Sequence, residues 1–312
     1  MIESWLPWIG FTAFVVGALA LDLALLHKTD EDIPIRAALK MTAFWVTLAL
    51  LFCAGIYFLE GDEAALTFLA GFLIEKSLSV DNLFVFLLVF TYFSTPSRYQ
   101  PKILFWGVLG AIVMRLIFIL AGVWLINMFD WIIYVFGLFL VVTGVKLSVQ
   151  GHTEVDPERN IVLRIFRRMM PVENNVESGK FFIRRGKVIY ATPLFVALLR
   201  VESSDLVFAM DSIPAILAIT RDPFLVYTSN IFAILGLRSL FFALSGVMKM
   251  FHYLSYGLTV ILVFLGLKML AADFYHLPIP LSLGFIGVTL LIAMGASFVF
   301  PPKDKGDAAV NR

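Results

Sequence analysis

Two acidic stretches lie within otherwise apolar parts of this 312-residue sequence. One covers residues 75–82 and the other residues 202–214, and each contains an acid followed six positions later by an aspartate. A charged side chain at the centre of a bilayer costs about 2.5–3.5 kcal/mol on insertion scales, so charged residues are rare in membrane spans and usually line a pathway. The two stretches are therefore the first candidates for chemistry, and their similarity raises the question of whether they form one site.

The polar side chains of both stretches mainly offer oxygen atoms as metal ligands. The candidate metal ligands are Glu75, Asp81, Asn82, Glu202, Asp205, Asp211 and Ser212. No histidine or cysteine lies within either stretch. Sites made only of oxygen ligands suit Mg²⁺, Ca²⁺ and Mn²⁺, whereas zinc and copper favour imidazole or thiolate. This donor set predicts a hard divalent cation as the ligand.

Helix geometry limits how the two acids of one stretch can act together. At about 100° per residue, positions six apart point about 120° away from a common face. Either the helix is unwound between the acids, or the two acids have different partners. On an unbroken helix, Glu75 shares a face with Ser79 and Asn82. Pro214 favours unwinding in the second stretch, because it has no N–H to donate to the carbonyl of Met210.

Nearby bases offer the acids a purely structural role in buried ion pairs. Lys76, Arg115 and Arg238 lie within apolar segments, and we expect them to pair with acids that shape or gate the site. Arg200 precedes the second stretch, where Glu202 and Asp205 are available to it as ion-pair partners. The alternative in which the acids only neutralise buried bases stays open at this point.

Composition places the acidic stretches in a membrane protein. Hydrophobic residues make up 60% of the chain and charged residues 15%, with a mean hydropathy of +0.91. A soluble domain of this length cannot bury so much apolar surface. The nine segments that we expect to span a membrane are roughly 5–27, 39–59, 64–93, 103–127, 130–149, 190–219, 224–248, 254–272 and 281–300. Residues 1–4 lack the basic stretch of a cleavable signal peptide, so the first segment is expected to remain as a span.

The distribution of basic residues predicts the orientation. If the N-terminus is outside, most of the 24 lysines and arginines face the cytoplasm and only Arg221 lies in an outer loop. This asymmetry follows the positive-inside rule. We therefore expect an all-α, polytopic, single transmembrane domain with its N-terminus outside and its C-terminus inside. Residues 150–189 are expected to form a cytoplasmic connector, in which residues 160–170 predict an amphipathic helix and residues 181–189 a small hairpin.

The third to fifth segments resemble the sixth to eighth. The matching motifs outside the acidic stretches are residues 110–115 with 233–238 and residues 144–146 with 266–268. Because each unit has an odd number of spans, the second unit must run opposite to the first across the membrane. Residues 64–149 and 190–272 therefore predict an inverted repeat of three spans each. Many secondary transporters are built in this way, with the binding site near the midplane where the halves meet.

Three long motifs carry a resemblance to a known family. They are residues 75–85 (EKSLSVDNLFV), 202–215 (ESSDLVFAMDSIPA) and 230–239 (NIFAILGLRS). They resemble the TerC family of integral membrane proteins, and residues 273–279 resemble its Alx-like branch. The resemblance covers nearly the whole chain, and the motifs are long and specific.

The resemblance implies a multi-pass protein of the bacterial inner (cytoplasmic) membrane that is related to the LysE superfamily. The family is named for tellurium resistance, its Alx-like branch has been called a redox modulator, and members are implicated in manganese export. By motif, the resemblance carries the acidic core of the family onto the seven candidate ligands. The family pattern is apolar at the position of Arg200, so a charge there is a departure from it.

The leading hypothesis is Mn²⁺ export by alternating access of two inverted halves, with Asp81 and Asp211 as the central pair. The alternatives are a membrane-bound redox modulator and a tellurite or oxyanion resistance protein without cation transport. Cys53 is the only thiol and cannot form a two-thiol redox centre, and an anion site is disfavoured because acids outnumber nearby bases.

No hydrolase motif is present, so we expect no enzyme activity. The expected partners are a divalent cation as substrate and membrane lipid, with no nucleic acid and no organic cofactor.

Overall fold

The structure is a computed structural model of the chain. It describes residues 5–26, 34–93, 95–129, 131–150, 163–164, 166, 168, 170–172, 179–185, 188–244, 253–274 and 277–299. Within these ranges, the side chains at positions 21–26, 80, 81, 84, 149, 150, 211, 244 and 255 lie outside the described part.

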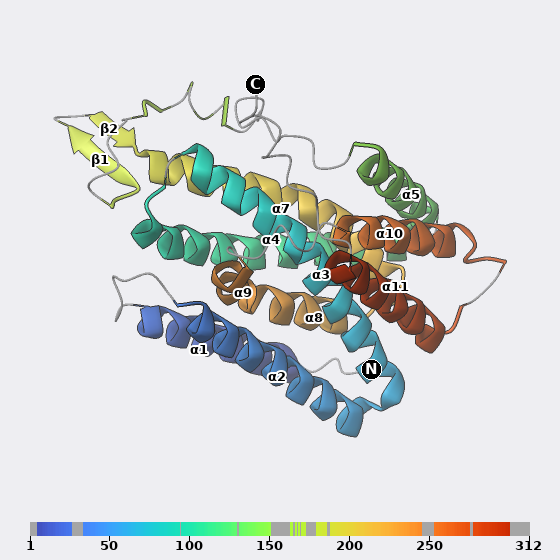
Figure 1. Cartoon of the computed structure of the whole chain (residues 1–312). Coiled ribbons are helices and arrows are strands. Elements are labelled where there is room, and N and C mark those ends of the chain that lie inside the picture. The colour runs from blue at the N-terminus through green and yellow to red at the C-terminus, as the bar shows by residue number, and fades with distance from the viewer. Residues whose placement is uncertain are drawn as a thin grey trace.

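The described residues form a helical bundle with one small hairpin (Figure 1). The elements are α1 (Leu6–Leu26), α2 (Ile35–Glu60), α3 (Asp62–Tyr92), η1 (Ser97–Tyr99), α4 (Gln100–Met128), α5 (Ile132–Gln150), β1 (Phe182–Arg185), β2 (Val188–Ala191), α7 (Pro193–Leu217), α8 (Pro223–Leu235), α9 (Leu237–Leu244), α10 (Leu254–Leu270) and α11 (Ile279–Val299). Each of the nine predicted segments contains a helix, and α8 and α9 share the seventh segment.

Among the described residues, four helical segments are long and apolar enough to cross a membrane by length and composition. They are α2, η1 with α4, α8 with most of α9, and α11. Shorter apolar runs of 10–17 residues lie in α1, α5 and α10. Helices α3 and α7 have 31 and 25 residues but carry the acidic stretches. The count of nine spans therefore stays a prediction.

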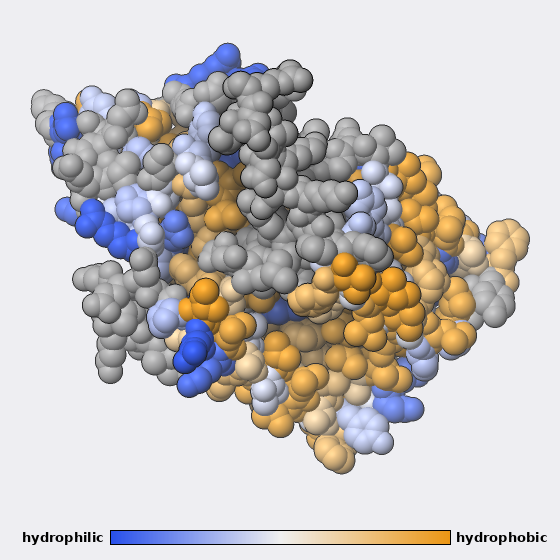
Figure 2. Space-filling view, viewed as in Figure 1, coloured by the Kyte–Doolittle hydropathy of each residue, from blue (hydrophilic) through white to orange (hydrophobic). Residues whose placement is uncertain are grey.

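Large apolar side chains cover much of the outer surface. Phe58 and Leu59 at the end of α2 are 82% and 87% exposed, and Leu291 on α11 is 70% exposed. Figure 2 shows such side chains over the face that carries α10 and α11. A surface of this kind is unfavourable in water and suits contact with lipid tails.

Helix α8 lies at the centre of the bundle. Every residue from Leu225 to Leu235 is buried, because α1, α2, α3 and α4 all pack around this helix. Helix α5 packs mainly against α10, and α11 covers α10 and α3. Helices α3 and α8 run parallel, and so do α4 and α7, whereas α5 and α10 run antiparallel. These directions are the ones that strict alternation across a membrane requires.

The two acidic stretches lie on continuous helices, and the backbone is interrupted elsewhere. Helices α3 and α7 both run unbroken through their acidic stretches, and Pro214 lies inside α7. Of the two alternatives, unwinding between the acids is therefore excluded, which leaves the one in which the two acids of a stretch have different partners. The interruption lies instead at Gly236, between α8 and α9.

The predicted hairpin within residues 181–189 is confirmed. Strands β1 and β2 pair antiparallel, with Phe182 opposite Ala191 and Arg185 opposite Val188. The predicted amphipathic helix over residues 160–170 lies mostly outside the described residues.

Glycines allow α5 and α10 to approach closely. A Cβ at Gly266 of α10 would lie 2.6 Å from the carbonyl oxygen of Gly137 and 2.9 Å from the amide nitrogen of Val141 on α5. A Cβ at Gly144 would lie 3.2 Å from the carbonyl oxygen of Thr259. Both contacts involve backbone atoms, so neither can be relieved by a change of side-chain rotamer.

We therefore expect Gly266→Ala to destabilise the protein. Separating two packed helices to admit a methyl group costs about 1–3 kcal/mol. Gly284→Ala in α11 is the matched control, because no atom lies within 4 Å of the position that a Cβ would take there. Alanine at this position is expected to be neutral or stabilising, by up to about 1 kcal/mol of helix propensity. Thermal melting of the detergent-purified variants measures both effects, and equal melting temperatures would contradict the close packing.

Candidate functional site

A single buried arginine joins four helices. Arg115 of α4 is 1% exposed and forms an ion pair with Glu75 of α3. Its Nη2 also lies 3.3 Å from Oδ1 of Asp205 on α7. Its Nη1 donates hydrogen bonds to Oδ1 of Asn230 on α8 at 2.7 Å and to Oγ of Ser212 on α7 at 3.3 Å. We call these five residues the Arg115 cluster.

Small residues let the helices of the Arg115 cluster approach one another. A Cβ at Gly110 of α4 would overlap the carboxylate of Glu202 on α7. A Cβ at Gly71 of α3 would lie 2.6 Å from Oγ of Ser229 on α8. Because these positions carry no side chain, α4 lies against α7 and α3 lies against α8. The two close contacts bring the acids of α3 and α7 to the same arginine.

One face of α3 is polar and fully buried. Glu75 and Ser79 are 0% exposed and Asn82 is 1% exposed, as expected for an unbroken helix. Among the described residues, Ser79 Oγ, Asn82 Oδ1 and Asp205 Oδ2 have no hydrogen-bond partner. Buried polar atoms normally find such partners. The site therefore contains several oxygens that are able to accept a donor or coordinate a cation.

Glu202 lies one helical turn before Asp205 on α7. Its side chain is half-buried against Gly110, and it interacts electrostatically with Asp205. Glu75 also interacts electrostatically with Asp205. Within the described part of the chain, no ion pair joins Arg200 to either Glu202 or Asp205, so neither of the two available pairings forms.

Lys76 has a different partner from the one predicted. Its ammonium group donates to the carbonyl oxygen of Ala233 in the last turn of α8 at 3.2 Å, and it lies beside the interruption at Gly236. The free carbonyls at a helix C-terminus attract cations, so this position is favourable. Arg238, at the start of α9, is buried with 5% exposure.

The polar side chains of α8 mostly bond to their own helix. Thr228 Oγ1 donates to the carbonyl oxygen of Phe224, and Ser229 Oγ and Asn230 Nδ2 both donate to that of Val226. These local bonds satisfy polar groups that are otherwise enclosed by apolar side chains.

The cluster matches part of the predicted site. The structure brings together Glu75, Asp205, Ser212 and Arg115, and it places Asn82 on the same face of α3 as Glu75. The pairing of Glu75 and Asp205 with Arg115 also agrees with the alternative in which acids neutralise a buried base.

Asn230 was missing from the predicted set, although it is the first residue of the motif 230–239. Its signal in the sequence was a polar run, Thr228 to Asn230, inside an apolar segment.

The predicted central pair cannot be placed. The side chains of Asp81 and Asp211 lie outside the described residues, so this expectation stays a prediction. Among the side chains that are described, no three from histidine, cysteine, aspartate or glutamate come together to hold a metal ion. In this conformation, the guanidinium of Arg115 lies between the acids of the two helices.

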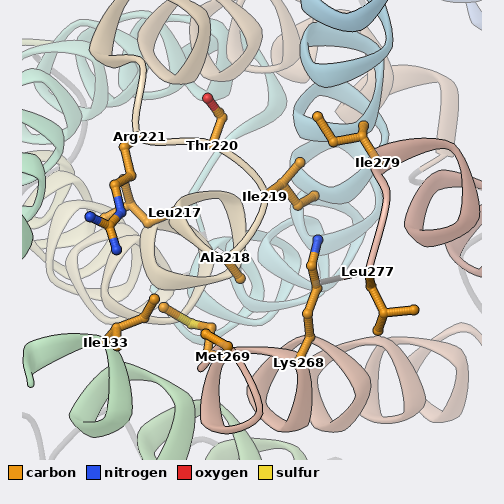
Figure 3. A pocket seen from close by; sticks show the side chains of 11 residues that line it. Ile133, Leu217, Ala218, Ile219, Thr220, Arg221, Lys268, Met269, Leu277 and Ile279 are labelled. Carbon is orange, nitrogen blue, oxygen red and sulfur yellow. The ribbon is translucent and has the colours of Figure 1, made fainter. Parts of the chain in front are cut away.

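A separate cavity of about 320 Å³ opens between α5, the end of α7 and α10 (Figure 3). Its lining includes Arg221 and Lys268 but no acid, and the Lys268 ammonium donates to Oγ of Ser282 at 3.1 Å. Two cationic side chains disfavour binding of a metal cation, so this cavity does not fit the predicted substrate.

Comparisons with known proteins give a consistent family. Residues 60–305 match the integral membrane protein TerC family. An uncharacterised membrane protein of Myxococcus xanthus is 49% identical over 302 residues, which cover 95% of this chain and 94% of that protein.

Proteins of the Alx type are similarly close. Alx of Salmonella typhi, named as a candidate membrane-bound redox modulator, is 47% identical over 310 residues, 96% of each chain. Its namesake in Escherichia coli K12 is 48% identical over 290 residues, 90% of each chain. No solved structure matches the chain. The family match and these relatives extend over most of the sequence, and the chain is therefore an Alx-like member of the TerC family of integral membrane proteins.

Proposed function

We propose that the protein transports a hard divalent cation, and that it exports Mn²⁺ across the bacterial inner membrane by alternating access. One observation carries the proposal. Glu75 of α3 and Asp205 of α7, which come from the two acidic stretches, meet at one buried point with hydroxyl and amide oxygens beside them. A site at the meeting point of two halves is the arrangement that secondary transporters use.

The charge at this point favours a cationic substrate. The Arg115 guanidinium carries one positive charge, whereas Glu75 and Asp205 together carry two negative charges when ionised, and Glu202 is a third acid nearby. Uncompensated buried charge is costly, and a bound cation offsets that cost. Carboxylate, amide and hydroxyl oxygens suit Mn²⁺, Mg²⁺ and Ca²⁺. Membership of the TerC family favours manganese among these three.

The packing of the helices supports an inverted repeat. In such a repeat, α3 corresponds to α7, α4 corresponds to α8 together with α9, and α5 corresponds to α10. Exchanging the two halves then turns the contact between α4 and α7 into the contact between α8 and α3. Both contacts are present, and both are parallel.

The glycines of α5 and α10 follow the same exchange. The matching motifs 144–146 and 266–268 align Gly144 with Gly266. The same offset between the two halves aligns Gly137 with Thr259. A Cβ at Gly266 would approach the carbonyl oxygen of Gly137, and a Cβ at Gly144 would approach that of Thr259. The two contacts are equivalent under the alignment, which favours a two-fold relation between the halves.

The name of the Alx relatives favours a redox role as the second candidate function. In this chain, Cys53 is the only cysteine, and its thiol donates to the carbonyl oxygen of Ala65 at 3.4 Å. A two-thiol centre within one chain is therefore impossible.

Removing either paired acid is expected to abolish transport. Loss of a buried charged partner is worth roughly 2–5 kcal/mol in binding, which is more than about tenfold in affinity. We expect Glu75→Gln and Asp205→Asn to reduce Mn²⁺ flux into proteoliposomes to background. Asp222→Asn is the matched control, because Asp222 caps α8 through its side-chain oxygen and asparagine can make the same bonds.

Equal reconstituted amounts and thermal melting separate loss of transport from loss of folded protein. Wild-type flux in both folded variants would remove the proposed site.

The pair Asp81 and Asp211 is expected to be equally necessary. Asp81→Asn and Asp211→Asn should each abolish Mn²⁺ flux, because each removes a carboxylate ligand of the predicted central pair. Flux of Mn²⁺, Mg²⁺ and Ca²⁺ compared in wild-type proteoliposomes gives the selectivity. Retention of full flux in both variants would show that these aspartates do not bind the substrate.

Cys53→Ser distinguishes the two candidate functions. Serine can donate the same bond to Ala65, so we expect unchanged stability and unchanged Mn²⁺ flux. A deletion strain that carries the variant is grown under two conditions. Growth under manganese stress tests Mn²⁺ export, and growth under oxidative stress tests the redox role. Loss of oxidative protection with normal flux would support a thiol-dependent redox function.

A further inference from the structure

Arg115 lies where a substrate cation would be expected to lie. Its guanidinium lies between acids from α3 and α7 and also donates to Ser212 and Asn230, which are two further oxygen donors of the site. We propose that Arg115 is a tethered cation that neutralises the site when it is empty and must leave Glu75 and Asp205 when the metal binds. This inference rests on the proposed function, because it concerns the same site.

Competition follows from burial and charge. Arg115 is 1% exposed and Glu75 is 0% exposed, so no solvent separates the charges. Repulsion between a divalent cation and a guanidinium is strong at such short range, and the low local dielectric strengthens it. The oxygens that face Arg115 are also the ones that a metal needs. Arg115 and the metal therefore exclude each other from the two carboxylates.

Glu202 provides a second position for the guanidinium. It lies one turn before Asp205 on α7, it is half-buried, and no ion pair to it is present among the described residues. Its carboxylate fills the space that a side chain at Gly110 would take. Since α4 and α7 run parallel, Gly110 and Glu202 lie toward the same end of the bundle relative to Arg115 and Asp205. An arginine side chain in a helix leans toward the N-terminus, which is the direction of Glu202.

The structure thus assigns two roles that differ from metal ligation. Arg115 closes the empty site by pairing with Glu75 and Asp205, and Glu202 receives Arg115 when the metal displaces it. Metal entry then replaces one set of ion pairs with another, so the buried acids are not left without a counter-charge.

The test measures Mn²⁺ binding to the purified full-length chain by thermal melting, with the chelated protein as reference. We expect Arg115→Gln to melt below wild type without metal, because Glu75 loses its partner. We also expect a larger stabilisation by Mn²⁺ and a half-maximal Mn²⁺ concentration at least about tenfold lower, because the competing cation is gone. Arg221→Gln, which changes an exposed arginine, is the control and should behave as wild type.

Two further variants keep the test decisive. Arg115→Lys retains a positive charge, but its ammonium group cannot reach all four partners of the guanidinium. Its half-maximal Mn²⁺ concentration should therefore fall between those of wild type and Arg115→Gln. The double variant Glu75→Gln with Arg115→Gln removes both charges. It should regain stability without metal and lose the Mn²⁺ response. If neither Arg115→Gln nor Arg115→Lys binds Mn²⁺ more tightly than wild type, the proposal is wrong.

A double-mutant cycle isolates the role of Glu202. Glu202→Gln should weaken Mn²⁺ binding in the wild-type background, because Arg115 loses its second partner, and should have no effect in the Arg115→Gln background. Weakening in both backgrounds would make Glu202 a metal ligand and contradict its receiving role.

Flux separates this inference from the proposed function. Tighter binding in Arg115→Gln with no Mn²⁺ flux in wild type would support the competition and reject transport. Flux in wild type without tighter binding in the variant would support transport and reject the competition.

Discussion

The buried guanidinium of Arg115 fixes the relation between helices that are distant in the sequence. Its partners Glu75, Asp205 and Asn230 come from α3, α7 and α8, so one side chain of α4 contacts three other helices. An arginine inside an apolar bundle is tolerated only if its charge is balanced by acids. The requirement works in both directions, since the acids are equally unfavourable without the arginine. The four helices therefore share one electrostatic centre.

Close approach of the helices is what makes that centre possible. Gly71 and Gly110 remove the side chains that would hold α3 away from α8 and α4 away from α7. The α5–α10 pair uses Gly137 and Gly266 in the same way at the periphery. Small residues at helix interfaces are typical of membrane bundles, where lipid gives little hydrophobic drive for helices to associate and packing contributes more. Around this closely packed interior, the face shown in Figure 2 is largely apolar.

The positions of the helices could be predicted from the sequence, but the contacts between distant helices could not. The helix positions follow from apolar length, the hairpin from the turn signal Arg-Gly in the sequence 181–189, and the buried face of α3 from the helical period. The partners of Arg115 were not predictable, because a pattern within one helix carries no information about which distant helix faces it. Lys76 shows the same limit, since its partner is a backbone carbonyl, which leaves no trace in the sequence. The interruption at Gly236 was not predicted, because one glycine among many is a weak signal in an apolar segment.

The self-contained bonding of α8 affects how this central helix is anchored. Its threonine, serine and asparagine side chains donate to carbonyls of their own helix, so they do not tie it to its surroundings. In the described part of the chain, the polar bonds that α8 accepts from other helices come from two cations, Arg115 to Asn230 and Lys76 to Ala233. The rest of its contacts with other helices are mainly apolar. These two cations therefore add fixed positions to the packing of α8, so that any event which moves both of them removes the polar bonds that α8 accepts from α3 and α4.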